Sequence, residues 1–216
     1  MTYNNNQRSP VIELAPELLS IPFRVQTDWH VITGAPCSGK TTLIKLLSEK
    51  GFQIIPEVGR MYVEREIARG RTLYEIRANT FVFNNIVKDM QLEIEHGLQP
   101  ANICFLDRAF PDSLAYFQLA GMNPNVILPE CFRHRYASVF VLDRFPVQKD
   151  AARSEDDISA DFLDQWLTRD YNALGYEAVR VPVLPPEERL MFIIERLSGY
   201  KTRKQPDDDL PCSSPG

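Results

Sequence analysis

The stretch Trp29–Leu43 reads WHVITGAPCSGKTTL and contains, at residues 34–41, a complete match to the phosphate-binding pattern G-x-x-x-x-G-K-[ST]. The apolar residues at 31–32 precede the match and predict a buried strand. Residues 42–50 follow it and place leucines at helical spacing. A strand, a glycine-rich loop and a helix in this order are the context that the pattern requires, which disfavours a chance glycine loop. The stretch predicts an α/β fold of the P-loop NTPase class.

The chemistry of this loop follows from its residue types. Gly34 and Gly39 allow the backbone to approach a phosphate chain, with N–H groups pointing at it from a helix N-terminus. Lys40 is expected to reach the β- and γ-phosphates, and the Thr41 hydroxyl to bind Mg²⁺. The expected nucleotide-binding residues are Gly34, Ala35, Pro36, Cys37, Ser38, Gly39, Lys40, Thr41 and Thr42. We therefore expect ATP, with GTP as the alternative, and Mg²⁺ as cofactors.

Strand and helix patterns alternate along the chain after the loop. Strands are expected at 31–32, 52–56, 103–106, 137–142 and 177–183, and helices at 42–50, 57–68, 72–96, 111–119, 160–174 and 186–197. An apolar face of the long helix is expected from Phe81, Phe83, Ile86, Val87 and Met90. This order predicts a three-layer α/β fold with a five-stranded, mainly parallel sheet, flanking helices and a lid region.

Composition is that of an ordinary globular protein. Of the 216 residues, 44% are hydrophobic and 25% are charged, so one domain with one substantial core is expected. The 24 basic and 29 acidic residues give a net charge of −5, which argues against a nucleic-acid partner. The four cysteines have no C-x-x-C spacing, so neither a zinc site nor a disulfide framework is expected.

Three segments are expected along the chain. Residues 1–27 form an N-terminal extension, residues 28–200 form the P-loop kinase or ATPase domain, and residues 201–216, rich in proline, serine and charge, form a disordered tail. No apolar run approaches the roughly 20 residues of a membrane span, and the N-terminus lacks the pattern of a signal peptide. We therefore expect a cytoplasmic protein without a membrane partner, and a homodimer is left open.

Ionisable residues follow three of the predicted strands, at the position where doubly wound sheets bind ligands. They are Glu57, the pair Asp107-Arg108 and the pair Asp143-Arg144. Asp107 closes an apolar strand and is expected to hold Mg²⁺ together with the loop threonine. Glu57 is placed to accept the proton of an attacking hydroxyl, as a general base does. For both acids the alternative is a helix N-cap or a first-turn charge.

The polar stretch Gln148–Asp157, QKDAARSEDD, has the composition of a mobile lid. Arg153 within it is expected to reach the transferring phosphoryl group, where a guanidinium stabilises the charge on three oxygens. The alternative is a solvated charged loop.

Further polar residues are candidates for contacts to the second substrate. Arginines expected to contact anions are Arg60, Arg108 and Arg144, and candidates for the acceptor pocket are Tyr62, Phe83, Asn84, Asp112 and Tyr116. Phe81 and Phe83 are at helical spacing, which favours a role in the core. Asn84 interrupts an apolar helix face, and a buried asparagine needs hydrogen-bond partners, among which a ligand amide or hydroxyl is one candidate.

Five segments together resemble a known family. They are GAPCSGKTT at 34–42, PEVGR at 56–60, FLDRAFPDSLAYF at 105–117, KDAARSEDD at 149–157 and the final run at 175–189, GY-x-x-VRVPVLPPEER. The ordered set is similar to the NadR-like AAA-type ATPase/kinase family, which includes the ribosylnicotinamide kinase domain of bacterial NAD-biosynthesis regulators. The resemblance covers about Asp28–Leu197.

The same segments are similar to the deoxynucleoside kinases. That resemblance implies that Glu57 is the base, that Asp107-Arg108 is the acid-arginine pair at the reaction centre, and that Arg153-Ser154-Glu155 belongs to a lid that closes over phosphates. Ala151 and Ala152 stand where those kinases often have arginines, and Ala109 replaces a serine that commonly follows the acid-arginine pair. These departures leave nucleoside specificity open.

These features predict ATP- and Mg²⁺-dependent phosphoryl transfer to a small hydroxyl-bearing acceptor, for which a nucleoside-like molecule is one candidate. Catalytic roles are assigned to Lys40, Glu57, Asp107, Arg108 and Arg153. The alternative is a regulatory ATPase or GTPase switch that acts through a protein partner. It is weakened by the lack of a guanine-reading N-K-x-D run and of a second acid beside Asp107. A non-catalytic relic is a third alternative, disfavoured because the loop lysine and both carboxylates are present.

Overall fold

The computed structural model describes residues 11–146 and 155–197. Within them, no helix combines the length and the apolar character that crossing a membrane requires. The predicted lid arginine, Arg153, and the predicted tail at 201–216 lie outside the described residues.

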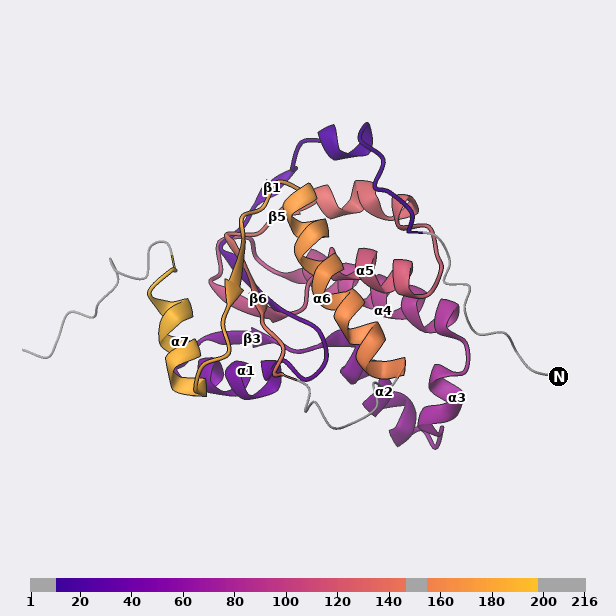
Figure 1. Cartoon of the computed structure of the whole chain (residues 1–216), viewed down its shortest axis with the longest axis horizontal. Coiled ribbons are helices and arrows are strands. Elements are labelled where there is room, and N and C mark those ends of the chain that lie inside the picture. The colour runs from indigo at the N-terminus through magenta and orange to yellow at the C-terminus, as the bar shows by residue number, and fades with distance from the viewer. Residues whose placement is uncertain (1–10, 147–154, 198–216) are drawn as a thin grey trace, which may run out of the picture.

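A five-stranded parallel sheet forms the centre of the structure (Figure 1). Its strands, in spatial order, are β3 (Gln53–Ile55), β4 (Cys104–Asp107), β2 (Trp29–Thr33), β6 (Ser138–Leu142) and β7 (Ala178–Val181). All four neighbouring pairs are parallel. The predicted fold class is therefore confirmed. Because β2 lies between β4 and β6, the segments that follow these three strands meet at one edge of the sheet.

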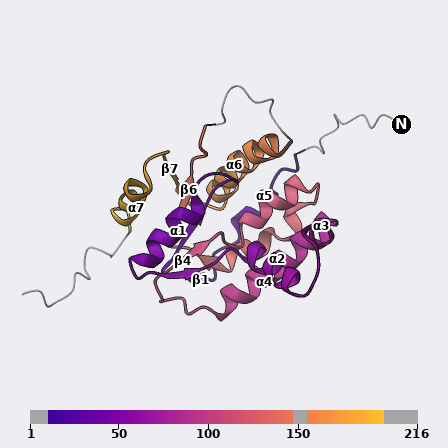
Figure 2. The same cartoon turned by 90° about the horizontal axis from the view of Figure 1, so that it is seen from below.

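Helices cover both faces of the sheet (Figure 2). On one face lie α1 (Lys40–Glu49) and α7 (Pro186–Ile194); on the other lie α4 (Thr80–Gly97), α5 (Asp112–Leu119) and α6 (Glu155–Ala173). A further helix, α2 (Val58–Ala68), contacts α4. The three layers agree with the prediction from the alternating pattern.

Successive side chains of β2 enter opposite layers of the core. Val31 belongs to the cluster that contains Leu114 of α5, while Ile32 belongs to the cluster that contains Leu43 of α1 and Ile193 of α7. All five side chains are almost fully buried. A parallel strand that is covered on both faces is mainly apolar, and the two buried polar side chains of β2 have partners: His30 lies 2.7 Å from Ser138 Oγ, and the Thr33 hydroxyl donates to Asp112.

The prediction of a single long helix at 72–96 is wrong, because the chain forms two helices there. In α3 (Leu73–Arg77), the Thr72 hydroxyl accepts from the Glu75 backbone N–H at 3.2 Å, and the Glu75 carboxylate accepts from the Thr72 N–H at 2.8 Å. Asn79 then takes an extended conformation, and its side chain accepts from the Val82 N–H at 3.0 Å to begin α4. Two local caps therefore separate the helices.

The predicted apolar face of α4 is wrong at Phe81, whose side chain is 54% exposed. The buried residues of this helix are instead polar: Asn84, Gln91 and Glu95. Glu95 accepts hydrogen bonds from the Phe110 backbone N–H and from a tyrosine hydroxyl, both at 2.8 Å. Glu95 is buried because partners from other elements satisfy its carboxylate, which helical periodicity alone does not reveal.

The segment at 11–26 packs against the domain. Leu14 belongs to the main core cluster, and the Ile12 backbone N–H donates to the Gln118 side chain at 3.1 Å. This segment contains the short elements η1 (Leu18–Ser20) and β1 (Val25–Gln26). The later short elements are η2 (Pro124–Val126), η3 (Leu128–Phe132) and β5 (His134–Arg135), and β1 pairs in parallel with β5. The described part of the extension is thus integrated into the fold.

The buried imidazole of His30 in β2 leads us to expect that the fold is less stable in acid. Its Nδ1 atom lies 2.7 Å from Ser138 Oγ, and burial lowers its pKa from 6.5 to about 4. The imidazole takes up a proton near pH 6.5 in the unfolded chain but only near pH 4 in the folded chain. Its contribution to the free energy of unfolding is therefore fully present above pH 6.5 and is lost as the pH falls from 6.5 through 4. The loss amounts to about 3 kcal/mol.

We expect His30→Gln to remove about 3 kcal/mol of the difference in unfolding free energy between about pH 7 and pH 4. Urea denaturation at both pH values measures that difference. His96→Gln is the matched control, since the side chain of His96 is 39% exposed. If His30→Gln keeps the pH dependence of the wild type, protonation of this imidazole is not what destabilises the fold.

Candidate active site

The phosphate-binding loop connects β2 to α1 at the carboxyl edge of the sheet. Gly34 has φ +144°, and a β-carbon there would lie 2.8 Å from the backbone oxygen of Leu142 in β6. Gly39 has φ +82° directly before α1. Both positions require glycine, one because β6 is close and the other because the backbone is left-handed. The loop thus follows the course that the sequence pattern predicts.

Lys40 folds back over the loop. Its Nζ atom donates to the backbone oxygens of Gly34 at 2.8 Å and of Ala35 at 3.2 Å, and only 8% of the residue is exposed. Burial lowers the pKa of this amine to about 7, with a further lowering from Arg108. Neighbouring carboxylates oppose the shift only in part. Among the described residues its hydrogen-bond partners are carbonyl oxygens, so this buried amine is suited to pair with an incoming phosphate, which favours its charged form.

Asp107 ends β4 beside the loop. Its Oδ1 atom is buried and lacks a hydrogen-bond partner among the described residues, as does the hydroxyl of Ser38 in the loop. Burial raises the pKa of the Asp107 carboxyl to about 6. An orphaned carboxylate oxygen at this point fits Mg²⁺, which is held by one or two protein groups together with substrate phosphates and waters. Thr41 in the first turn of α1 would supply the second group.

Arg108 occupies the centre of the site in an unusual backbone conformation. Its φ is +73°, and its backbone N–H donates to the Ile32 oxygen at 3.0 Å. The guanidinium lies between two carboxylates, with Nε 3.5 Å from Glu57 Oε1 and Nη1 3.1 Å from Asp112 Oδ1. It also covers the ring of Tyr116 at 5.2 Å. Backbone strain at a non-glycine residue is typical of functional sites.

Asp112 holds this arginine in place. Oδ1 accepts from Arg108 and from the Thr33 hydroxyl, while Oδ2 accepts from the Tyr171 hydroxyl at 2.6 Å and from the Ala109 backbone N–H at 3.2 Å. Since protein donors engage both oxygens and only 3% of the residue is exposed, the geometry favours a positioning role over the predicted contact with an acceptor.

Glu57 precedes α2 and faces the same centre. It stands at the N-cap position of the helix, but its side chain makes no capping hydrogen bond. Its carboxylate lies 3.5 Å from Arg108 and 3.9 Å from Arg60. The alternative role as a helix cap therefore has no support in the geometry, whereas a role at the reaction centre stays open.

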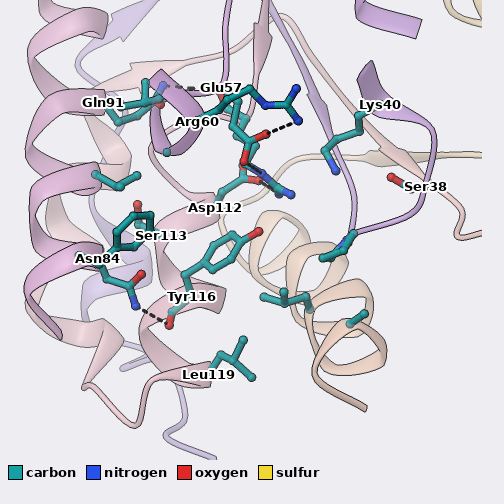
Figure 3. A pocket seen from close by; sticks show the side chains of 18 of the residues that line it. Ser38, Lys40, Glu57, Arg60, Asn84, Gln91, Asp112, Ser113, Tyr116 and Leu119 are labelled. Carbon is teal, nitrogen blue, oxygen red and sulfur yellow. Dashed lines mark hydrogen bonds and ion pairs between the residues drawn. The ribbon is translucent and has the colours of Figure 1, made fainter. Parts of the chain in front are cut away.

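One cleft of about 800 Å³ joins these groups. The predicted site residues that line it are Pro36, Cys37, Ser38, Gly39, Lys40, Thr41, Glu57, Arg60, Asn84, Arg108, Asp112 and Tyr116. Figure 3 shows Glu57, Asp112 and Tyr116 between Lys40 on one side and Asn84 on the other. The cleft thus extends from the phosphate loop to the wall formed by α4.

Other predicted residues lie outside the lining of the cleft: Gly34, Ala35, Thr42, Tyr62 and Asp107. Tyr62 is 5% exposed and packs on the ring of Phe83 at 5.8 Å, so it supports the wall from behind. Phe83 itself lines the cleft. Arg144, a predicted anion contact, pairs instead with Asp161 of α6.

Sequence reasoning missed several residues of the site. Arg77, Gln91 and Ser113 line the cleft. Arg189 of α7 is buried, and its guanidinium donates to backbone oxygens of Ser38, of Pro182 at 2.8 Å and of Asp143 at 3.1 Å. Gln91 is detectable as the residue seven positions after Asn84, which places both on one helix face. Arg189 contacts segments that are distant in the sequence, and no local sequence pattern predicts these contacts.

Comparisons with known proteins agree with this fold. Residues 29–189 match the model of the AAA domain family, and no curated protein matches the sequence. Thymidylate kinase from Ehrlichia chaffeensis superposes with a TM-score of 0.57 at 15% identity, over 81% of this chain and 100% of that chain. Deoxyadenosine kinase from M. mycoides superposes with a TM-score of 0.52 at 14% identity, over 78% and 97%.

A NadR protein in complex with NR superposes with a TM-score of 0.56 at 16% identity, over 80% of this chain and 51% of that chain. The family match covers most of the described domain, and the structural matches share its fold, which confirms the resemblance inferred from the five segments. The fold is that of the P-loop kinases, and the chain belongs to the AAA domain family.

Proposed function

We propose that the protein transfers the terminal phosphoryl group of ATP to a hydroxyl group of a small acceptor. The observation that carries this proposal is the cleft itself, which joins the phosphate loop, Glu57 and Arg108 to a separate wall on α4. The part of this cleft that extends from Glu57 and Arg108 to α4 offers space for a hydroxyl-bearing acceptor beside the phosphate loop. The kinase folds of the superposed structures support the same proposal.

Each group of the centre has a role in this reaction. The loop N–H groups and Lys40 would bind the phosphates, and Glu57 would accept the proton of the acceptor hydroxyl as its oxygen attacks the γ-phosphorus. The bond from that phosphorus to the β-phosphate oxygen breaks, and ADP leaves. Arg108 would stabilise the charge on the transferring group. Thr41 and Asp107 would hold Mg²⁺, which neutralises phosphate charge when bound.

The test is turnover of ATP·Mg²⁺ and of GTP·Mg²⁺ by the purified protein, alone and with a panel of nucleosides, nucleoside monophosphates, ribosylnicotinamide and small alcohols, with mass spectrometry of the products. We expect a phosphorylated acceptor that forms only in the presence of the panel compound. Tight nucleotide binding with slow hydrolysis and no phosphorylated product contradicts the proposal and favours the switch that acts through a protein partner.

Tyr171 lies outside the lining of the cleft, but its hydroxyl donates a hydrogen bond to Asp112. We therefore expect a substitution of Tyr171 to affect phosphoryl transfer. Tyr171→Phe removes the hydroxyl that fixes Asp112, so Arg108 loses part of its support. We expect kcat to fall by on the order of tenfold while the KM for ATP stays within about twofold. The matched control is Tyr176→Phe, because Tyr176 is also buried and donates to the backbone oxygen of His134 at 3.2 Å. An equal loss of kcat in both variants would indicate a general effect on packing.

A further inference from the structure

One face of α4 forms the wall of the cleft opposite the phosphate loop. Asn84 and Gln91 line this wall, with Val87 between them. Since they are seven residues apart, the two amides lie on the same side of the helix, about 10 Å apart along its axis. Figure 3 shows both side chains on this wall. An acceptor in the cleft therefore meets two amide groups separated by an apolar side chain.

The orientation of each amide follows from its partner. Asn84 Nδ2 donates to the Tyr116 backbone oxygen at 3.2 Å. Gln91 Nε2 donates to Glu95 Oε1 at 2.9 Å and lies 3.5 Å from the Arg108 backbone oxygen. A backbone oxygen only accepts hydrogen bonds, and Glu95 Oε1 already accepts from a backbone N–H. The nitrogen of each amide must therefore face the protein.

The oxygens of both amides are left to face the cleft. Neither Asn84 Oδ1 nor Gln91 Oε1 accepts a hydrogen bond from any residue that the structure describes. The residues are only 8% and 4% exposed. Neither oxygen is among the buried side-chain atoms of the described residues that lack a hydrogen-bond partner, so the small exposed surface of each residue includes its amide oxygen. Both oxygens are therefore available to accept a hydrogen bond from a ligand in the cleft.

We propose that Asn84 Oδ1 and Gln91 Oε1 select an acceptor substrate that carries N–H or O–H donors along the edge facing α4. The inference rests on the proposed phosphoryl transfer and names the chemistry of the molecule that receives the group. A substrate with methylated nitrogens, or with only acceptor atoms on that edge, leaves these oxygens without donors and is rejected. Sites built to bond a donor discriminate strongly against analogues that lack it.

The test compares pairs of substrates in which one member lacks the exocyclic N–H donors of the other. The pairs are adenosine with N6,N6-dimethyladenosine, cytidine with N4,N4-dimethylcytidine, and ribosylnicotinamide with its carboxylate analogue. For each pair with a phosphorylated member, we expect kcat/KM of the donor-bearing compound to exceed that of its partner at least tenfold. The same ratio is measured in Asn84→Leu, where it should fall toward one.

Asn85→Leu is the matched control, because Asn85 also donates to a backbone oxygen, that of Phe81 at 2.9 Å, but does not line the cleft. This variant should keep the ratio of the wild type. Equal kcat/KM within the pairs for the wild type, or an unchanged ratio in Asn84→Leu, overturns the inference and leaves phosphoryl transfer intact. The absence of phosphorylated product from every compound overturns the proposed function, and the inference with it. If Asn84→Leu does not fold, equal kcat/KM within the pairs for the wild type still overturns the inference.

Discussion

Lys40→Ala is expected to lower turnover of ATP by at least about a hundredfold, because this amine is proposed to bind the phosphates and no other lysine lines the cleft among the described residues. The fold should persist. The variant loses two hydrogen bonds to loop oxygens, but it also removes a cation whose burial lowers its pKa to about 7. The two effects on stability oppose each other, so Tm should change little.

Initial rates of ADP formation and thermal unfolding together check this expectation. Lys45→Ala is the control on the same helix, since the side chain of Lys45 is 77% exposed and lies 3.7 Å from Glu49. It should leave the rate and Tm near the values of the wild type. Turnover that survives Lys40→Ala in a folded protein means that phosphates bind elsewhere, and the assignment of the loop fails.

Glu57→Gln is expected to slow transfer to the acceptor by on the order of a hundredfold or more while the affinity for ATP stays nearly unchanged. Glutamine keeps the size of the side chain but cannot take the proton of the attacking hydroxyl. Because Glu57 makes no capping hydrogen bond to α2, the substitution should not destabilise that helix. The measurements are single-turnover transfer to the acceptor and equilibrium binding of ATP.

Glu64→Gln, at an exposed position of α2, provides the control for removing one negative charge from this helix. Transfer that proceeds normally in Glu57→Gln would show that Glu57 anchors Arg60 and Arg108 rather than accepting a proton. A loss of ATP affinity of the same size as the loss of transfer would place the carboxylate near the nucleotide instead of the acceptor.

The sequence predicts those parts of the site that short, local patterns encode. The glycines and the lysine of the loop are fixed by backbone geometry at a strand–helix junction, which explains why Gly34 and Lys40 lie where the pattern puts them. Glu57, Asp107 and Arg108 were expected because parallel strands bring their carboxyl ends to one edge. Their placement near this edge agrees with the expectation, while their chemical roles stay predictions.

The features of the fold and the site that the sequence does not predict depend mostly on contacts between segments that are distant in the chain. Glu95 on the polar side of α4 is buried because it accepts hydrogen bonds from Tyr136 and Phe110. A prediction that uses only the spacing of apolar residues would instead place this side of the helix in solvent. The positioning of Asp112 likewise depends on Tyr171, which lies 59 residues further along the chain. The break between α3 and α4 is different, because Thr72, Glu75 and Asn79 carry capping signals that are visible in the sequence.

The left-handed backbone of Arg108 places a conformational cost at the proposed reaction centre. Glycine adopts a φ of +73° at little cost, whereas a residue with a β-carbon is destabilised there by roughly 1 to 2 kcal/mol. The ion pairs of the guanidinium with Glu57 and with the buried carboxylate of Asp112 offset this backbone cost, and glycine would lose both of them. The proposed reaction centre is thus built on a strained backbone conformation that the side-chain contacts of Arg108 hold in place.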